Sequence, residues 1–164
     1  MLICGIDPGL NVTGYGLLAA TPRGVTLKGT GYIRTSAKEP LPKRLEDIHG
    51  ALRRVLEQYK PQALVLEKIY AHYRHPVTAS LLGHVRGVIA MLARECAIDY
   101  FEYSATRVKK TVTGKGHASK LQVQRMIEHM LGFSAEALGP VDVTDAVGVA
   151  LTHVLCARQQ QSLA

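Results

Sequence analysis

Four carboxylates stand at points where predicted strands end or a predicted helix begins, and together they suggest one chemistry. They are Asp7, Glu67, Asp142 and Asp145. If they converge in one cleft they repel one another, and raised pKa values would leave some of them protonated. Divalent cations remove that repulsion, and Mg²⁺ prefers such oxygen ligands. Carboxylates that hold two ions ~3.5–4 Å apart are a recurrent device for phosphodiester hydrolysis, so the pattern predicts a metal-dependent nuclease.

Each acid alone also has a simpler explanation. Asp7 is followed by Pro and Gly, which suits the start of a turn. Glu67 could be a solvated strand end. Asp142 and Asp145 would stabilise a helix N-terminus in their own right. The metal-site hypothesis depends on the recurrence of acids at several element ends.

Composition favours a polyanionic partner. The 164 residues are 47% hydrophobic and 20% charged, with a net charge of +7, which points to nucleic acid first and a membrane surface second. We expect one domain over residues 1–158 and a disordered tail over 159–164. No stretch approaches the ~20 apolar residues of a membrane span, and no signal peptide is recognisable. Three scattered cysteines indicate free thiols in a reducing cytoplasm.

The apolar runs predict five strands: 2–6, 13–20, 25–35, 63–66 and 98–103. A turn at 21–24 joins the second and third strands into a hairpin. The run before Glu67 is apolar on both faces, which is typical of a parallel sheet covered by helices. If it lies parallel beside the first strand, Asp7 and Glu67 emerge together at the carboxyl end, where open α/β sheets place ligands.

Apolar spacing predicts helices over 42–59, 77–96, 120–131 and 141–158. In the first, a charged face that includes Arg44 is expected to be solvated. The second is apolar on more than one side, with Gly83 and Gly87 four apart, so it lies in the core or between subunits. Leu82 and Ile89 are its expected outward positions. Asp142 and Asp145 are three apart and point the same way from the last helix.

The most basic stretch, 104–123, surrounds a glycine loop that contains Lys115. Ser119 and Gln122 form a capping box, which puts Lys120 in the first turn of a helix, where the dipole disfavours a cation. Lys120 is either tolerated surface charge or part of a phosphate site. Tyr70 lies in a basic loop and either stacks on unpaired bases or covers the sheet edge.

Over nearly its whole length the sequence resembles the RuvC-type crossover junction endodeoxyribonucleases, bacterial Holliday junction resolvases with an RNase H-like fold. The resemblance rests on these motifs: GIDPG with VTGYG over 5–16, Leu66-Glu67, Gly83 with Arg86-Gly87, Val108-Lys109, GKGHASKLQV over 114–123, Asp142 with Asp145-Ala146, and Thr152-His153. It implies an α/β fold with a mixed five-stranded sheet, an antiparallel hairpin followed by parallel strands, flanked by helices.

By the same resemblance, the four acids are the catalytic, metal-binding set, and Lys109 and Lys120 match functional lysines. Tyr70 falls where the family carries an aromatic near the junction point. One departure is Lys68, where relatives often have Gln. The expected DNA-binding residues are Tyr70, Arg86, Lys109, Lys115 and Lys120.

The implied reaction is hydrolysis of a scissile phosphate with two Mg²⁺ ions per subunit, and Mn²⁺ as a substitute. Lys120 would neutralise developing phosphate charge. The resemblance also implies a homodimer that cuts two strands of like polarity in a four-way DNA junction, alongside a branch-migration helicase complex, in recombination and repair. No membrane partner is expected.

Two other classes compete with this interpretation. ATPases of the actin and sugar-kinase type also end their first strand in an Asp-x-Gly turn, but they need two such domains to enclose a nucleotide. A non-catalytic junction-binding protein would keep the basic surface, yet it should lack some of the acids. Cleavage of a synthetic four-way junction with Mg²⁺ distinguishes these classes.

Overall fold

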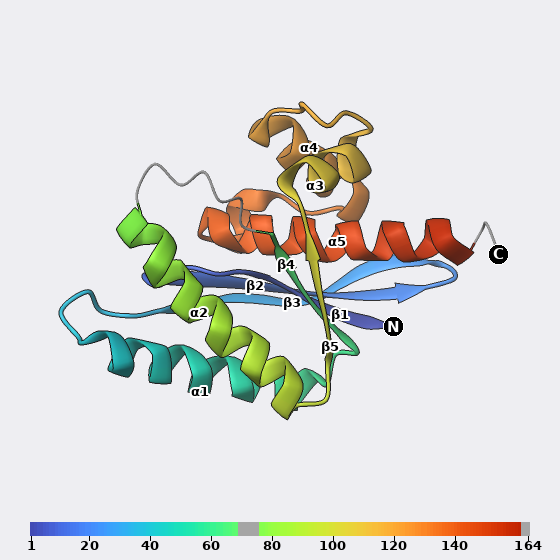
Figure 1. Cartoon of the computed structure of the whole chain (residues 1–164). Helices are drawn as coiled ribbons and strands as arrows, with labels where there is room; N and C mark the ends of the chain where they lie inside the picture. Colours follow the sequence, from blue (N-terminus) through green and yellow to red (C-terminus); the bar gives the residue numbers. More distant parts are fainter. Residues whose placement is uncertain (69–75, 162–164) are drawn as a thin grey trace.

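The computed structural model describes residues 1–68 and 76–161 and is built on one five-stranded mixed sheet (Figure 1). The strand order is β3-β2-β1-β4-β5. β1 pairs antiparallel with β2 and β2 antiparallel with β3, whereas β1, β4 and β5 run parallel. The strands are β1 (Leu2–Asp7), β2 (Val12–Thr21), β3 (Gly24–Arg34), β4 (Ala63–Glu67) and β5 (Asp99–Tyr103). The predicted fold class is confirmed.

The register between β1 and β4 places the first two acids side by side. Ile6 pairs with Leu66, so Asp7 and Glu67 are the next residues at the same end of adjacent parallel strands. Both strands are buried up to these positions. Strand pairing alone therefore brings Asp7 and Glu67 together at the carboxyl end of the sheet, as expected.

Helices cover both faces of the sheet (Figure 1). The helices are α1 (Leu41–Tyr59), α2 (Pro76–Glu95), α3 (Ala105–Thr113), α4 (Lys120–Leu131) and α5 (Val141–Gln161), with a 3₁₀ turn at Ala135–Leu138. One core joins α1 and α2 to the sheet through residues such as Leu52 and Ile89. The other joins α5, α3 and α4 to the opposite face, through residues such as Val147, Val108 and Ile127.

α5 lies unusually close to the sheet. A Cβ added at Gly14 would overlap the backbone carbonyl of Asp142, so the first turn of α5 rests directly on β2. Only glycine permits that approach, because any side chain there would push the helix away. The helix also continues to Gln161, so residues 159–161, which the sequence assigned to a tail, are helical.

α2 is buried on one side only. Val85, Ile89 and Leu92 are fully buried, so Ile89 is a core residue, contrary to the expectation that it points outward. Added Cβ atoms at Gly83 and Gly87 would meet nothing within 4 Å. By length and composition alone α2 could cross a membrane, contrary to the expectation that no stretch is apolar enough to do so. Its buried side, however, packs against α1 and β5 in the core.

Arg44 corrects the expectation of a solvated face on α1. Its residue surface is only 8% exposed, and its guanidinium donates to the hydroxyl of Thr35 at 2.8 Å and to the carbonyl of Leu10 at 3.0 Å. Thr13 donates to the carbonyl of Gly9 at 2.7 Å. These bonds hold the segment that follows Asp7, because Leu10 and Gly9 lie between β1 and β2.

Candidate active site

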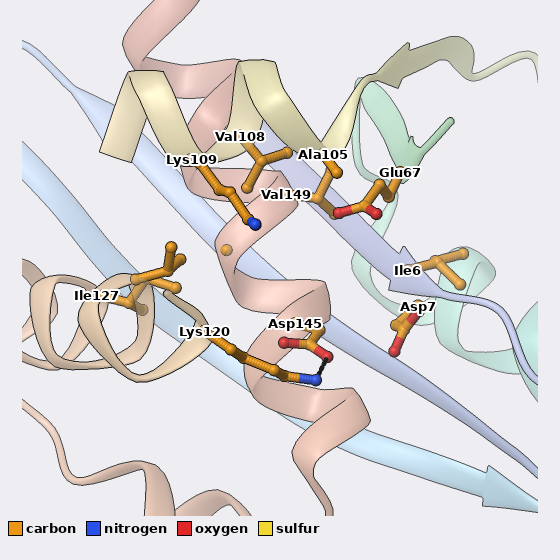
Figure 2. Close-up of a pocket in the computed structure, with 12 residues that line it drawn as sticks. Ile6, Asp7, Glu67, Ala105, Val108, Lys109, Lys120, Ile127, Asp145 and Val149 are labelled. Atoms are coloured by element: carbon orange, nitrogen blue, oxygen red, sulfur yellow. Dashed lines mark hydrogen bonds and ion pairs between the residues drawn. The ribbon is translucent and has the colours of Figure 1, made fainter. Parts of the chain in front are cut away.

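An open cavity of about 310 Å³ lies at the carboxyl ends of β1 and β4, between the sheet, α3, α4 and α5 (Figure 2). It is lined by Ile6, Asp7, Glu67, Ala105, Val108, Lys109, Lys120, Val123, Ile127, Asp145, Gly148 and Val149. We call it the acid pocket. Its walls combine three carboxylates and two lysines with apolar side chains, so charged groups meet in partly desolvated surroundings.

Three of the four predicted acids line this pocket. Asp7 comes from the end of β1, Glu67 from the end of β4, and Asp145 from the beginning of α5. Asp142 lies one turn earlier on α5 and is not among the lining residues. Its charge nevertheless acts on Asp7 and contributes to raising the pKa of that carboxyl.

Burial and mutual repulsion raise the pKa of the first two acids. Burial, followed by the charges of Asp145 and Asp142, raises the pKa of Asp7 to about 7, although Lys120 opposes the shift. Partial burial and then Asp145 raise the pKa of Glu67, and Lys109, Lys120 and Arg86 oppose it. Glu67 is exposed as a residue, although its carboxyl is partly desolvated where it lines the pocket. The pocket holds more negative charge than its lysines balance.

Lys120 reaches into the pocket from the first turn of α4. Ser119 is the N-cap of this helix and forms the predicted capping box with Gln122, so Lys120 is the first helical residue. The ammonium of Lys120 donates to Oδ2 of Asp145 at 2.6 Å (Figure 2). Burial lowers the pKa of Lys120, but this bond and the charges of Asp145, Asp7 and Asp142 raise it above its ordinary value. Lys120 is therefore charged and directed at the acids.

Lys109 is carried by α3, a helix that is not among those predicted from the sequence. Ser104 caps it by accepting a hydrogen bond from the backbone of Arg107. Val108 and Val112 bury its inner side, which directs the adjacent Lys109 along the pocket (Figure 2). Two apolar positions four apart were the only periodic signal, which is too short a pattern to identify a helix.

The donor set of the pocket fits divalent cations in its chemistry. Carboxylate oxygens are the ligands that Mg²⁺ and Mn²⁺ accept, and a cation would relieve the repulsion that raises the pKa of Asp7. Within residues 1–68 and 76–161, no three Asp, Glu, His or Cys side chains lie close enough to hold an ion. Binding of an ion by three of these groups therefore requires the carboxylates to draw together.

Among the other expected DNA-binding residues, Arg86 and Lys115 do not line the acid pocket. The side chain of Arg86 is only 11% exposed and pairs with Glu102, so its guanidinium is used inside the protein. Lys115 lines a separate groove of about 320 Å³ beside α4, together with Gln122 and Arg125. Tyr70 lies outside the described residues.

Comparison with known proteins shows which family this chain resembles. The family model described as "Crossover junction endodeoxyribonuclease RuvC" matches residues 3–153. A protein of that name from Rhodopirellula baltica is 38% identical over 91% of this chain and 83% of its own length. The structure of Thermus thermophilus RuvC is similar with a TM-score of 0.89 at 32% identity, covering 98% of this chain and 97% of that one. T. thermophilus RuvC in complex with a Holliday junction substrate matches with a TM-score of 0.90 at 32% identity, over 98% and 96% of the two chains.

Proposed function

The chain belongs to the RuvC family of crossover junction endodeoxyribonucleases, and we propose that it resolves four-way DNA junctions by hydrolysing phosphodiester bonds in the acid pocket. The observation that carries the proposal is the joining of Asp7, Glu67 and Asp145 with Lys109 and Lys120 in one open pocket. Carboxylates can bind a metal cation, and lysines can bind a phosphate. A pocket that contains both kinds of group can therefore hold a DNA phosphate beside the metal ions that assist its hydrolysis.

The cofactor is Mg²⁺, with Mn²⁺ as a substitute, and two ions bind per subunit. Asp7, Glu67, Asp142 and Asp145 would hold them. When bound, the ions supply Lewis acidity to the attacking water and to the leaving 3′ oxygen. Asp142 serves as the fourth ligand if its carboxylate turns toward Asp7, whose pKa already responds to it.

The two lysines have different tasks. Lys120 would turn from Asp145 to the scissile phosphate and stabilise there the charge that develops on the phosphate oxygens. Lys109 binds the DNA backbone beside the cut. Lys115, which lies outside the acid pocket, extends the DNA contact, and Tyr70 is expected to stack on an unpaired base near the junction point.

The active assembly is a homodimer, with α2 as its interface. Val77 is 72% exposed and Met91 is 51% exposed, and Gly83 and Gly87 face open space, so a second backbone could approach closely. A four-way junction has two-fold symmetry, and a two-fold dimer presents two acid pockets to it. A branch-migration helicase complex is the expected partner, and the cytoplasm is the expected location.

The test is cleavage of a synthetic four-way junction with Mg²⁺, with nicks mapped on all four strands. We expect two symmetric nicks in strands of like polarity, none with a chelator, and none in a linear duplex of the same sequence. Asp7→Asn should bind the junction without metal as the wild type does and leave it uncut. Binding without any metal-dependent nick in the wild type would favour a non-catalytic junction-binding protein.

A further inference from the structure

Arg86 joins three elements at the edge of the acid pocket. It is carried by α2, and one guanidinium nitrogen, Nη1, donates to the backbone carbonyl of Glu67 at 2.7 Å. The other terminal nitrogen, Nη2, pairs with the carboxylate of Glu102 on β5. α2, β4 and β5 therefore meet at one planar group, directly behind a catalytic acid.

The partners of Arg86 are themselves fixed. Glu102 pairs in register with Leu66 on the neighbouring strand, and it accepts a hydrogen bond from the hydroxyl of Tyr100 at 2.8 Å. Burial raises the pKa of Glu102, but the bonds from Tyr100 and Arg86 and the charge of Arg86 outweigh it and hold that pKa below its usual value. Glu102 is thus a charged, oriented anchor for the guanidinium.

Glu67 needs such support because it is the last residue of β4. The sheet holds its backbone on the β5 side, where the amide of Lys68 donates to the carbonyl of Tyr103 at 2.7 Å. Arg86 adds the bond to the carbonyl of Glu67 from α2. An exposed catalytic carboxylate keeps its orientation only if its backbone is fixed by its neighbours.

We propose that Arg86 is a positioning residue, which uses Glu102 as its anchor to set the orientation of Glu67 in the acid pocket. Through this link, the placement of α2 also governs the competence of the pocket on its own subunit. The proposal rests on the proposed function, because cleavage is its readout. It assigns Arg86 an internal role in place of the DNA contact expected from sequence.

The two roles predict opposite behaviour. A phosphate contact would contribute to binding, and its loss would weaken junction affinity and reduce the salt dependence by about one phosphate. A positioning residue affects the rate at saturating junction and leaves metal-free binding unchanged. Neutralising Glu102 separates the two roles further. If Arg86 contacts DNA, removal of the neighbouring negative charge should strengthen junction binding. If Arg86 positions Glu67, loss of its anchor should slow cleavage.

The experiment measures single-turnover cleavage at saturating junction with Mg²⁺, and junction affinity without metal at several salt concentrations. The variants are Arg86→Met, Arg86→Lys and Glu102→Gln. Arg53→Met is the matched control, because it also breaks an arginine–glutamate pair between two elements, here α1 and α2, but at Glu95 and away from the pocket.

We expect Arg86→Met to slow cleavage ~10–10²-fold, as small misplacements of a catalytic group do, with unchanged affinity and salt dependence. Arg86→Lys and Glu102→Gln should be slowed less, and Arg53→Met should match the wild type. Full cleavage rates for Arg86→Met and Glu102→Gln would overturn the proposal, as would a loss confined to affinity. If Arg86→Met does not fold, Arg86→Lys and Glu102→Gln decide by the same criteria. A wild type that makes no nick would instead refute the proposed function.

Discussion

α5 and α2 are similar in length and both are rich in apolar residues, yet the molecule uses them differently. α5 is buried over most of its length, and its first turn packs directly on Gly14 of β2. α2 buries only Val85, Ile89, Leu92 and Ala93, and its glycines face open space. An apolar helix pressed against a glycine-bearing strand belongs to the core, whereas one with open glycines leaves apolar surface uncovered.

The difference also separates two contributions to the active site. α5 carries Asp142 and Asp145 on a helix that cannot shift without disturbing the core. α2 contributes no pocket-lining residue in the described part of the chain, and its Arg86 donates to the backbone carbonyl of Glu67. α5 is thus a fixed platform for two of the acids, whereas α2 supports the site from its edge and leaves its other side exposed.

Two substitutions on α2, two residues apart, should behave in opposite ways. Ile89→Glu places a charge in the core and should cost more than ~4 kcal/mol of unfolding free energy. Met91→Glu, at a 51% exposed position, should keep the fold and weaken the dimer, so that paired nicks become single. Thermal unfolding and sedimentation at micromolar concentration measure both effects. A Met91→Glu dimer as stable as the wild type would place the interface elsewhere.

Two glycine substitutions compare the helices directly. Gly14→Ala should displace the first turn of α5, cost upwards of ~3 kcal/mol because a backbone must move, and reduce cleavage with it. Gly83→Ala adds its methyl to open space within a helix and should raise monomer stability by up to ~1 kcal/mol. Chemical denaturation of each variant gives the comparison. If Gly14→Ala were as mild as Gly83→Ala, the close contact between α5 and β2 would not be essential.

Substitutions of the two lysines test whether Lys120, which is paired with Asp145 of α5, acts on the scissile phosphate. Lys120→Ala should lower the cleavage rate ~10²–10³-fold, by analogy with removing one transition-state donor. Lys109→Ala should mainly weaken junction binding and flatten its salt dependence. Rates at saturating junction and binding without metal separate the two. An unchanged rate for Lys120→Ala would reduce its bond with Asp145 to a surface ion pair.

The pKa of Asp7 predicts how stability depends on pH without metal. Its folded-state value is about 7, above the ordinary 3.8, so between these values the folded state binds more protons than the unfolded state. The free energy of unfolding should therefore fall as the pH rises through this window. After allowance for partial exposure, we expect ~1–3 kcal/mol from this group. Asp7→Asn should lose that dependence, and Mg²⁺ should restore wild-type stability above neutral pH. Parallel wild-type and Asp7→Asn melting curves across pH would contradict the shift.

Much of this arrangement was predictable from local patterns. The short apolar run before Glu67 identified a parallel strand, and its place beside β1 followed from the fold class. The capping box located the start of α4 and therefore Lys120. These predictions were correct because strand burial and helix capping depend on residues that are close in sequence.

What the sequence did not reveal depends on contacts between distant segments. Arg44 was assigned to solvent because its partners, Leu10 and Thr35, belong to other elements. Ile89 was placed outward because a helix apolar on several sides does not show which side meets the core. The pairing of Arg86 with Glu102 was not foreseen either, because it depends on strand register.

The central claim is that the acid pocket binds divalent cations, and crystals of the protein grown with Mn²⁺ and a nicking-resistant junction test it most directly. Anomalous scattering locates Mn²⁺ independently of any assumption about its ligands. We expect two peaks among Asp7, Glu67, Asp142 and Asp145, at ~2.0–2.3 Å from carboxylate oxygens, with Lys120 turned from Asp145 to the scissile phosphate. Crystals in which Lys120 still holds Asp145 and no peak lies beside these acids would contradict the account.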